Sequence, residues 1–368
     1  MEKKSTYRLM ISGGGTGGHI YPALAIANTW MELHPGSEIL FVGAIGKMEM
    51  QKVPEAGYKI VGLPVAGLQR SLSKENLSFP IKLLKSIRQA SKIIKDFMPD
   101  VVIGVGGYAS GPVLYMAQRK GIPTLIQEQN SYAGLTNKLL SKKALKICVA
   151  YPDMEKFFPA EKIVYTGNPV RKDILELAGK REKALSHFGL EEGRKTVLIL
   201  GGSLGARTLN QAVLKDINAL NENYQVLWQC GKFYFKDMLQ SLDGKGYNHI
   251  HLREFIRKMD LAYAAADVVV SRAGALSVSE LSLVAKPVIF IPSPNVAEDH
   301  QTKNAMAYVQ HDAAVLLKDA DAVGALKDNL DQLLGDEERC IQLGKNLHAL
   351  AKPNAANEIC GEILRLVG

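Results

Sequence analysis

Short apolar runs alternate along the chain with longer segments of helical periodicity. The runs span residues 8–12, 38–42, 58–63, 101–105, 124–127 and 145–149 in the first half, and 196–200, 225–229, 268–271, 287–291 and 314–317 in the second. Nearly continuous apolar strands separated by helices are typical of parallel sheets that are covered on both faces. Strand-then-helix repetition builds right-handed βαβ units, so the pattern predicts a doubly wound α/β fold.

Each half begins with a strand that runs into a glycine-rich turn and then a helix. The turns are Gly13-Gly14-Gly15-Thr16-Gly17-Gly18 and Gly201-Gly202-Ser203-Leu204-Gly205-Ala206. A length of 368 residues fits two domains of roughly 100–200 residues each. We predict domains over 1–167 and 168–368, a charged helix over 171–188, and a final amphipathic helix over about 340–368 that is a candidate for packing back on the N-terminal domain.

Composition narrows the class of protein. Hydrophobic residues make up 47% and charged residues 22%, as in an ordinary globular protein. No run reaches the roughly 18 apolar residues of a membrane span, and the apolar run at residues 9–11 is too short for a signal peptide. The four cysteines, without CxxC pairing, favour buried free thiols over a disulfide framework or a zinc site; they are Cys148, Cys230, Cys340 and Cys360.

A net charge of +8 predicts an acidic partner, which could be nucleic acid, anionic lipid or a phosphorylated substrate. The stretch 68–95 mixes apolar residues with seven basic ones, and Glu75 is its one acid before Asp96. Such a stretch is typical of an element that contacts an anionic membrane surface. The alternative is an amphipathic helix that packs on the sheet and exposes a basic face to water. Nucleic acid is disfavoured, because no aromatic residues interleave the basic ones and no known binding module is present.

The first glycine turn offers a phosphate both close backbone approach and the positive end of a helix; the alternative is a tight turn without a ligand. It is not a Walker A loop, because no Gly-Lys-Ser/Thr follows. It also fits a dinucleotide site poorly, because no acidic residue ends the strand 38–42. His19 closes the turn. A helix N-terminus would lower its pKa and keep it able to accept a proton, although a structural histidine bonded to backbone is the alternative.

The second half contains three further candidate segments. The turn 201–207 offers backbone amides, the Ser203 hydroxyl and the Arg207 guanidinium to a phosphate. In 271–280 the amides of Ala275 to Ser277 would face an anion and Glu280 would accept ribose hydroxyls, unless Ser277-x-x-Glu280 is a capping box. The polar segments 299–304 and 127–130 suit hydroxyl recognition or simply begin helices.

Asp319-Ala320-Asp321 is an acid-x-acid triplet of the kind that holds a metal in some sugar-transfer enzymes. Because aspartate is a favoured N-cap, we predict that it caps a helix instead.

Several motifs together resemble those of the MurG family, bacterial N-acetylglucosaminyltransferases that convert lipid I to lipid II. They recur in order from residue 13 to beyond residue 300, so the resemblance covers nearly the whole chain. The motifs are Gly14-Gly15-Thr16-Gly17-Gly18-His19, Gly106-Gly107-Tyr108-Ala109-Ser110-Gly111-Pro112, Glu128-Gln129-Asn130 with Ala133-Gly134-Leu135-Thr136-Asn137-Lys138, Gly167-Asn168-Pro169-Val170-Arg171, Gly201-Gly202-Ser203-x-Gly205-Ala206-Arg207 and Ser271-Arg272-Ala273-Gly274-Ala275.

The resemblance implies a GT-B fold, in which two Rossmann-like domains face each other across a cleft. It implies UDP-N-acetylglucosamine as donor, held mainly by the C-terminal half, and undecaprenyl-diphosphate-linked N-acetylmuramoyl pentapeptide as acceptor. The enzyme would be peripheral at the cytoplasmic face of the bacterial inner membrane and act in peptidoglycan synthesis, and thus in cell shape and division. Inversion at the sugar C1 requires a base and a way to neutralise the departing diphosphate. No cofactor and no metal are expected.

The resemblance also assigns roles to residues. His19 is implied as the base, with Glu128 as the alternative. The residues implied to bind substrate are Thr16, Gly17, Gly18 and Asn130 beside the donor sugar and acceptor, Arg171 and Ser203 on the diphosphate side, Ile256 by the uracil, Ala275, Leu276, Ser277, Val278, Ser279 and Glu280 around diphosphate and ribose, and Gln301 at the donor sugar. The chain departs from the family where His300 precedes Gln301 in place of a Gln pair, and where Leu204 stands in place of Gln.

Three other functions fit parts of this pattern. A different GT-B transferase would act on diacylglycerol, a non-hydrolysing UDP-sugar epimerase would need no acceptor, and a nucleotide-binding regulatory protein would bind UDP-sugar without turnover. The low acid count around 201–207 and the basic apolar stretch favour an acceptor that is a diphosphate lipid.

Overall fold

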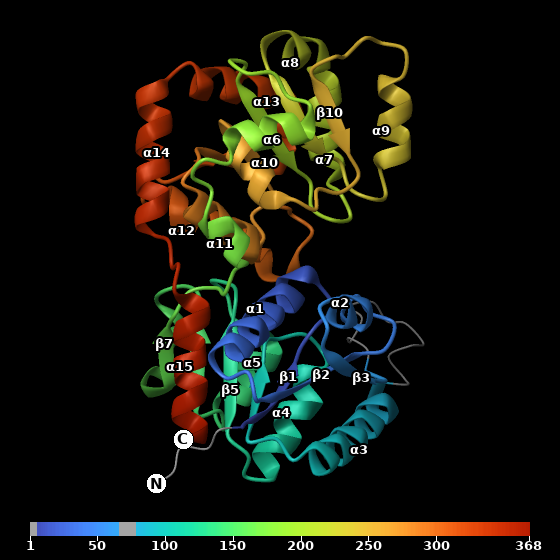
Figure 1. Cartoon of the computed structure of the whole chain (residues 1–368), viewed down its shortest axis with the longest axis vertical. Coiled ribbons are helices and arrows are strands. Elements are labelled where there is room, and N and C mark those ends of the chain that lie inside the picture. The colour runs from blue at the N-terminus through green and yellow to red at the C-terminus, as the bar shows by residue number, and fades with distance from the viewer. Residues whose placement is uncertain (1–5, 66–78) are drawn as a thin grey trace. The chain divides into compact units, whose positions relative to one another are not determined.

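The computed structural model describes residues 6–65 and 79–368 and divides the chain into two compact units. The first unit comprises Met1–Val170 and Lys352–Gly368, and the second comprises Arg171–Ala351. Each unit contains one all-parallel sheet with helices on its faces (Figure 1). The prediction of two doubly wound parallel-sheet domains is therefore confirmed.

The first sheet has the strand order β3-β2-β1-β4-β5-β6-β7. Its strands are β1 (Arg8–Ser12), β2 (Glu38–Ala44), β3 (Lys59–Leu63), β4 (Val101–Gly104), β5 (Thr124–Glu128), β6 (Lys146–Val149) and β7 (Ile163–Tyr165). Its helices are α1 (Gly17–Leu33), α2 (Glu49–Glu55), α3 (Phe79–Phe97), α4 (Ser110–Arg119), α5 (Leu135–Ser141) and α15 (Ala355–Val367). The order reverses between β1 and β4, which places a switch point at their carboxyl ends.

Successive side chains of β1 contribute to a hydrophobic core on each face of this sheet. Successive strand residues point to opposite faces. Leu9 and Ile11 pack in a cluster with Trp30 of α1 and Ile359 of α15, whereas Met10 packs in a second cluster with residues of α3 and α4. The C-terminal helix α15 therefore lies beside α1 and completes the N-terminal unit (Figure 1).

The second sheet repeats this topology, with the order β10-β9-β8-β11-β12-β13. Its strands are β8 (Thr196–Leu200), β9 (Gln225–Gln229), β10 (Ile250–Arg253), β11 (Val268–Ser271), β12 (Val288–Phe290) and β13 (Val315–Leu316). Its helices are α6 (Arg181–Phe188), α7 (Arg207–Lys215), α8 (Ile217–Asn223), α9 (Phe235–Leu242), α10 (Met259–Ala265), α11 (Ala275–Val284), α12 (His300–Val309), α13 (Asp319–Leu334) and α14 (Glu337–Ala349). Here the switch point lies between β8 and β11.

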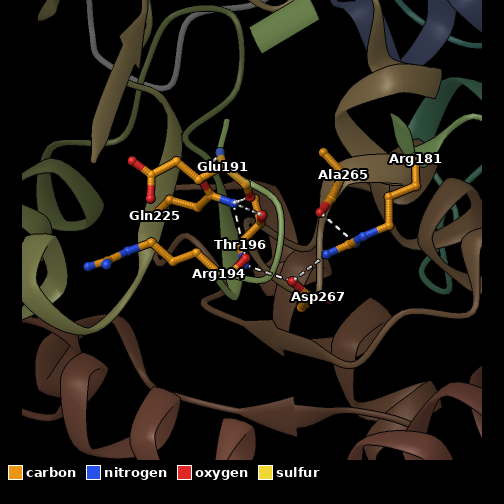
Figure 2. A network of polar contacts seen from close by, with 7 residues as sticks. All are labelled: Arg181, Glu191, Arg194, Thr196, Gln225, Ala265 and Asp267. Atoms are coloured by element: carbon orange, nitrogen blue, oxygen red, sulfur yellow. Dashed lines mark hydrogen bonds and ion pairs between the residues drawn. The ribbon is translucent and has the colours of Figure 1, made fainter. Parts of the chain in front are cut away.

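A polar network closes the amino-terminal edge of the second sheet (Figure 2). Asp267, just before β11, accepts hydrogen bonds from the Thr196 backbone N–H at 2.7 Å and from Arg181 of α6 at 3.1 Å. Gln225 donates to the carbonyls of Glu191 and Arg194 and to the Thr196 hydroxyl. These contacts fill much of the amino-terminal edge with bonds inside the protein, and the ligand-facing loops of a doubly wound sheet lie at the opposite, carboxyl edge.

Several predicted elements differ from the observed ones. Residues 171–188 form a 3₁₀ turn (Lys172–Leu175) and α6 in place of one helix. The predicted terminal helix over 340–368 is two helices, because Pro353 has no N–H to donate and disfavours helical backbone at Lys352. The strands β7 and β10 were not predicted; both lie at sheet edges and are only partly buried. The apolar run of β7 is three residues long, which is short for a strand, and β10 mixes apolar with basic residues (Ile-His-Leu-Arg).

Two further expectations concern membranes and thiols. Within residues 6–65 and 79–368, no helix has the length and apolar character needed to cross a bilayer. All four cysteines are free; three of them are buried, as predicted, and Cys340 is partly buried.

Candidate active site

In the first unit the glycine turn lies at the switch point of the sheet. The turn follows β1 and meets the loop that follows β4, where the Gly14 N–H donates to the Gly106 carbonyl at 3.3 Å. Ligands of doubly wound sheets bind at the carboxyl ends of the strands at this position. The predicted glycine turn therefore lies at the edge of the sheet where ligands of such folds bind.

The turn contains a carboxylate that the sequence did not reveal. Glu49, the first residue of α2, is 1% exposed and accepts hydrogen bonds from the Gly15 N–H at 2.8 Å and the Ala44 N–H at 2.9 Å. A Cβ on Gly14 would lie 2.2 Å from the Glu49 side chain, so glycine is required there. The Gly15 amide, which we expected to face a phosphate, is therefore bound to a protein carboxylate.

The amides that remain for a ligand belong to the start of α1. Thr16 is the N-cap, makes no side-chain capping bond, and is followed by Gly17 and Gly18 with no acid in the first turn. An uncapped helix N-terminus presents free N–H groups and a positive dipole end. Thr16, Gly17 and Gly18 thus lie together beside His19.

His19 is partly buried, and its Nδ1 lies 3.0 Å from Oε1 of Gln129. Burial lowers the pKa of His19 below its ordinary 6.5, against the opposing effects of Glu128, the Gln129 hydrogen bond, the Val105 carbonyl and Glu49. The direction agrees with the expectation from the sequence, although burial is the largest cause. A neutral imidazole at pH 7 can accept a proton.

Glu128, the alternative base, ends β5 and is 2% exposed. Its Oε2 accepts from the Gly134 N–H at 2.9 Å and from Asn137 Nδ2 at 2.8 Å, and its Oε1 accepts from the Asn130 N–H at 3.1 Å. Asn130 Nδ2 also lies 3.4 Å from Oε1. The carboxylate is thus engaged in holding the loop 130–137, which makes His19 the better candidate base.

In the second unit the turn 201–206 occupies the corresponding switch point. Ala206 is the N-cap of α7 and makes no side-chain capping bond, and Ser203 is exposed. The Gly205 N–H donates to the Gly202 carbonyl, and the Ser203 carbonyl accepts from the Lys232 N–H. The turn is thus held by backbone hydrogen bonds, within itself and from Lys232, and its exposed Ser203 lies just before the uncapped start of α7.

The helix after β11 begins in the same way. Its N-cap is Gly274, so Ser277 lies within the first turn and the capping-box alternative is wrong. Residues 275–279 therefore form the start of α11, with the Gly274 carbonyl accepting from the Val278 N–H and the Ser279 hydroxyl donating to the Ala275 carbonyl. The first turn, including Leu276, contains no acid.

Glu280 follows on α11 with three donors around it. Arg171 donates to its Oε1 from both Nε and Nη2 at 3.3 Å, and the Tyr263 hydroxyl donates to Oε2 at 3.1 Å. Burial raises the pKa of Glu280, which Arg171 and Tyr263 partly offset. Burial would lower the pKa of Arg171, but the charges of Glu280, Asp173 and Tyr263 and the Glu280 hydrogen bond together raise it. The sequence predicted Glu280 and Arg171 separately and did not show that they are paired.

Two more predicted residues belong to this unit, Ile256 in a loop and Gln301 at the start of a helix. The Ile256 N–H donates to Oε1 of Gln229 at 2.8 Å, and the Ile256 side chain is 3% exposed. Gln301, in the first turn of α12, accepts from the Ser293 N–H at 2.9 Å through Oε1. That bond orients the amide so that its NH₂ group, a donor, is presented.

Asp319 does not cap a helix, contrary to the prediction. The N-cap of α13 is Lys318, and the Asp319 carboxylate forms an ion pair with Arg272 and accepts from the Thr208 hydroxyl at 2.9 Å. Asp319 therefore ties the start of α13 to α7 and to the loop after β11. Within the described ranges, no group of three or more potential metal ligands is close enough to hold an ion.

The described part of the basic stretch is α3, since residues 66–78 lie outside the described residues. Ala90 and Ile94 of α3 are buried against the sheet, as the packed-helix alternative requires. Ile81 and Leu84 are nonetheless 59% and 56% exposed, and the basic side chains Lys85, Arg88, Lys92 and Lys95 are exposed with them. The helix therefore packs through one face and presents an apolar and basic face to its surroundings.

Comparison with known protein families assigns both halves of the chain. Residues 9–149 match the glycosyltransferase family 28 N-terminal domain, and residues 196–359 match the glycosyltransferase family 28 C-terminal domain. The chain belongs to glycosyltransferase family 28. Its membership agrees with two uncapped, glycine-rich helix starts, one in each unit, at the switch points of their sheets.

Full-length relatives narrow the family 28 assignment. A protein of Flavobacterium psychrophilum is 56% identical, with 98% of each chain covered, and one of Parabacteroides distasonis is 54% identical with the same coverage. Both are named UDP-N-acetylglucosamine–N-acetylmuramyl-(pentapeptide) pyrophosphoryl-undecaprenol N-acetylglucosamine transferase. The resemblance inferred from the motifs is thus confirmed.

Solved structures agree with this family 28 assignment. MurG of Acinetobacter baumannii has a TM-score of 0.77 at 29% identity, covering 98% of this chain and 99% of that one. A UDP-GlcNAc 2-epimerase from Neisseria meningitidis has a TM-score of 0.68 at 16% identity, covering 97% and 99%. The epimerase shares the fold alone, which is the GT-B fold expected from the motifs.

Proposed function

We propose that the chain transfers N-acetylglucosamine from UDP-N-acetylglucosamine to the C4 hydroxyl of N-acetylmuramoyl(pentapeptide)-diphosphoundecaprenol, with inversion at C1. The observation that carries this proposal is the 56% identity, over 98% of the chain, to a relative named as that transferase. The site supports it, because each unit has an uncapped helix N-terminus at its switch point and the first unit adds a histidine with a lowered pKa.

The second unit is the proposed donor site. The starts of α7 and α11 offer free amides and positive dipole ends to the diphosphate, with the Ser203 hydroxyl beside the first of them. Glu280, oriented by Arg171 and Tyr263, accepts the ribose hydroxyls through its remaining lone pairs. Ile256 borders the uracil and Gln301 donates to the sugar.

The first unit is the proposed acceptor and catalytic site. His19 takes the proton of the C4 hydroxyl as that oxygen forms a bond to C1 of the donor sugar. The bond between C1 and the diphosphate oxygen breaks on the opposite side, and UDP leaves with the electron pair. Positive helix ends stabilise the charge that develops on the leaving group. Thr16, Gly17, Gly18 and Asn130 border the reacting sugars.

The membrane contact is proposed on the exposed face of α3. An apolar pair, Ile81 and Leu84, flanked by exposed lysines and arginines suits insertion into an anionic interface, and would hold the enzyme at the inner face of the bacterial plasma membrane. Binding of the protein to anionic and to neutral phospholipid vesicles tests this. Ile81→Glu with Leu84→Glu should abolish binding to anionic vesicles, whereas Leu239→Glu, at an apolar residue of α9 that is 53% exposed, should not. Equal binding by both variants would refute the assignment.

The decisive activity test is transfer of radiolabelled sugar to a lipid I analogue. We expect product with UDP-N-acetylglucosamine and much less with UDP-glucose. Diacylglycerol in place of the lipid I analogue tests the alternative transferase, and incubation without acceptor tests for epimerised UDP-sugar. Absence of product with the lipid I analogue, from protein that still binds UDP, would overturn the proposed function.

A further inference from the structure

A buried network of side-chain amides lies behind His19. Gln129, which is 1% exposed, places its Oε1 3.0 Å from Nδ1 of His19. Its Nε2 donates to the Val105 carbonyl at 2.8 Å and to the Gln127 carbonyl at 3.1 Å. Gln129 therefore joins the candidate base to the ends of two neighbouring strands, β4 and β5.

The orientation of the Gln129 amide follows from these backbone partners. A peptide carbonyl can only accept a hydrogen bond, so the group that faces the Val105 and Gln127 carbonyls must be the NH₂. The Gln129 oxygen is then the atom that faces His19. Turning the amide over would bring its oxygen against two carbonyl oxygens. Because that oxygen can only accept, the hydrogen of this bond must be carried by His19 Nδ1.

A second set of buried side-chain amides, those of Asn168 and Gln127, lies behind Gln129 and restrains it. Asn168, 2% exposed, donates from Nδ2 to the Gln129 carbonyl at 3.0 Å, so its Oδ1 is the atom that accepts from Nε2 of Gln127 at 3.0 Å. The Oε1 of Gln127 then also faces the NH₂ group of Gln129, whose two hydrogens are shared among this oxygen and the Val105 and Gln127 carbonyls. Backbone carbonyls thus determine the orientation of the Gln129 and Asn168 amides. Asn168 lies two residues before the end of the first unit, in the segment that leads to the second.

We propose that Gln129 is a positioning residue that holds neutral His19 in the tautomer with hydrogen on Nδ1, and so leaves the lone pair of Nε2 as the proton acceptor. The role of that lone pair rests on the proposed function, whereas the tautomer does not. The charged groups that act on His19 are Glu128 and Glu49, and both favour its protonated form. Gln129 is neutral, so it orients the ring without adding a further negative charge.

The tautomer can be measured without any activity assay. In full-length protein labelled with ¹⁵N-histidine, the two ring nitrogens of a neutral imidazole have well-separated chemical shifts according to which carries hydrogen. The chain has 8 histidines, and His19→Gln identifies the signals of His19 by their loss. We expect a protonated Nδ1 and an unprotonated Nε2 in the wild type. A protonated Nε2 would overturn the proposal.

Two substitutions test whether Gln129 determines the tautomer of His19. Gln129→Met, similar in length, removes the acceptor and should give a mixture of tautomers, with kcat reduced at least tenfold and KM for UDP-N-acetylglucosamine unchanged. The reduction should stay within the roughly 10²–10⁴-fold that a general base contributes. Gln118→Met is the matched control, because Gln118 donates to the Thr124 hydroxyl and the Leu140 carbonyl in the same unit and does not touch His19. A Gln129→Met variant with wild-type tautomer and kcat would refute the proposal.

Gln129→Glu provides a test if the methionine variant does not fold. A carboxylate still accepts from Nδ1–H, so the tautomer should persist, and its negative charge should raise the His19 pKa. The acidic limb of the kcat profile, where His19 becomes protonated and inactive, should therefore move to higher pH. An unmoved limb together with an altered tautomer would contradict the proposal. If the wild type transfers no sugar, the proposed function fails, and the NMR measurement still decides the tautomer.

Discussion

The glycine turns after β1 and β8 look alike in sequence and differ in what binds their backbone. In the first, the Gly15 amide is bound to the buried carboxylate of Glu49. In the second, the Gly205 amide donates to the turn's own Gly202 carbonyl, and a Cβ on Gly231 would lie 2.1 Å from the Gly205 nitrogen. One turn is held by an anion of the protein and the other by backbone packing. A glycine-rich turn at a helix start thus indicates a binding site. Which ligand the turn can accept depends on which of its amides are already hydrogen-bonded within the protein.

This difference suits a division of labour in the proposed reaction. A turn that already holds a carboxylate is a poor place for a diphosphate. Its described neighbours include His19 and Glu128, which can exchange a proton, and Gln129, which hydrogen-bonds His19. A turn held by its own backbone keeps its helix N-terminus for an anionic donor. Four predictions test this contrast, in order of decreasing effect.

Replacement of His19 should have the largest effect and should act on the chemical step. His19→Ala should lower kcat by about 10²–10⁴-fold, the usual contribution of a general base, with little change in KM for the donor. In the wild type, kcat should fall as the pH drops through the His19 pKa, which lies below 6.5, because the protonated ring cannot accept a proton. His187→Ala, an exposed histidine of α6, is the control. An unchanged kcat would exclude His19 as the base.

Replacement of Glu280 should act on donor binding in the second unit. Loss of hydrogen bonds to a charged group costs about 1–3 kcal/mol, so Glu280→Ala should raise KM for UDP-N-acetylglucosamine by roughly 5- to 150-fold. Because burial raises the Glu280 pKa, the wild-type KM should also rise as the pH falls, beginning above the ordinary carboxyl range. The control is Asp331→Asn, because Asp331 forms an ion pair with Lys327 on α13, away from α11. A larger effect on kcat than on KM would place Glu280 in the chemical step instead.

Glu49 should matter for stability and for the shape of the first turn. Glu49→Ala removes the acceptor of the Gly15 N–H and leaves the buried Ala44 N–H unpaired, which should cost about 1–3 kcal/mol of unfolding free energy. For a unit of this size each kcal/mol lowers Tm by about 2–4 °C in a thermal scan. Glu55→Ala, on the exposed side of the same helix, should change Tm little. If Glu49→Ala bound UDP more weakly than the wild type without loss of stability, a purely structural role of Glu49 in the turn would be wrong.

The smallest effect is expected at Asp319. Asp319→Asn keeps an acceptor for Thr208 and loses the ion pair with Arg272, so kcat/KM for the donor should fall by about two- to fivefold, the effect of about 0.5–1 kcal/mol. Arg272 also donates to the Ile291 and Pro292 carbonyls, which hold it in place. Initial rates at low donor concentration measure this effect, and complete loss of activity would point to a direct role in catalysis.

The sequence predicted correctly those parts of the fold that depend on a local pattern of apolar residues. The central strands β1, β8, β9 and β11 were predicted with their observed bounds, because a strand buried on both faces is apolar throughout. The edge strands β7 and β10 were missed, because β7 has only three residues and β10 mixes apolar with basic residues, whereas the edge strands β3 and β13 were predicted from their apolar runs. The break between α14 and α15 was missed although Pro353 marks it.

The sequence by itself determined the class of fold, the family and the position of both glycine turns, because these depend on residues that are near neighbours in the chain. Only the tertiary structure decided what each turn holds. Glu49 lies 34 residues from Gly15, and Gln129 lies 110 residues from His19. Hydrogen bonds between such distant residues form only after the parallel strands bring their carboxyl ends to one edge of the sheet. For that reason the sequence proposed His19 as a base, and the structure showed which atoms orient it.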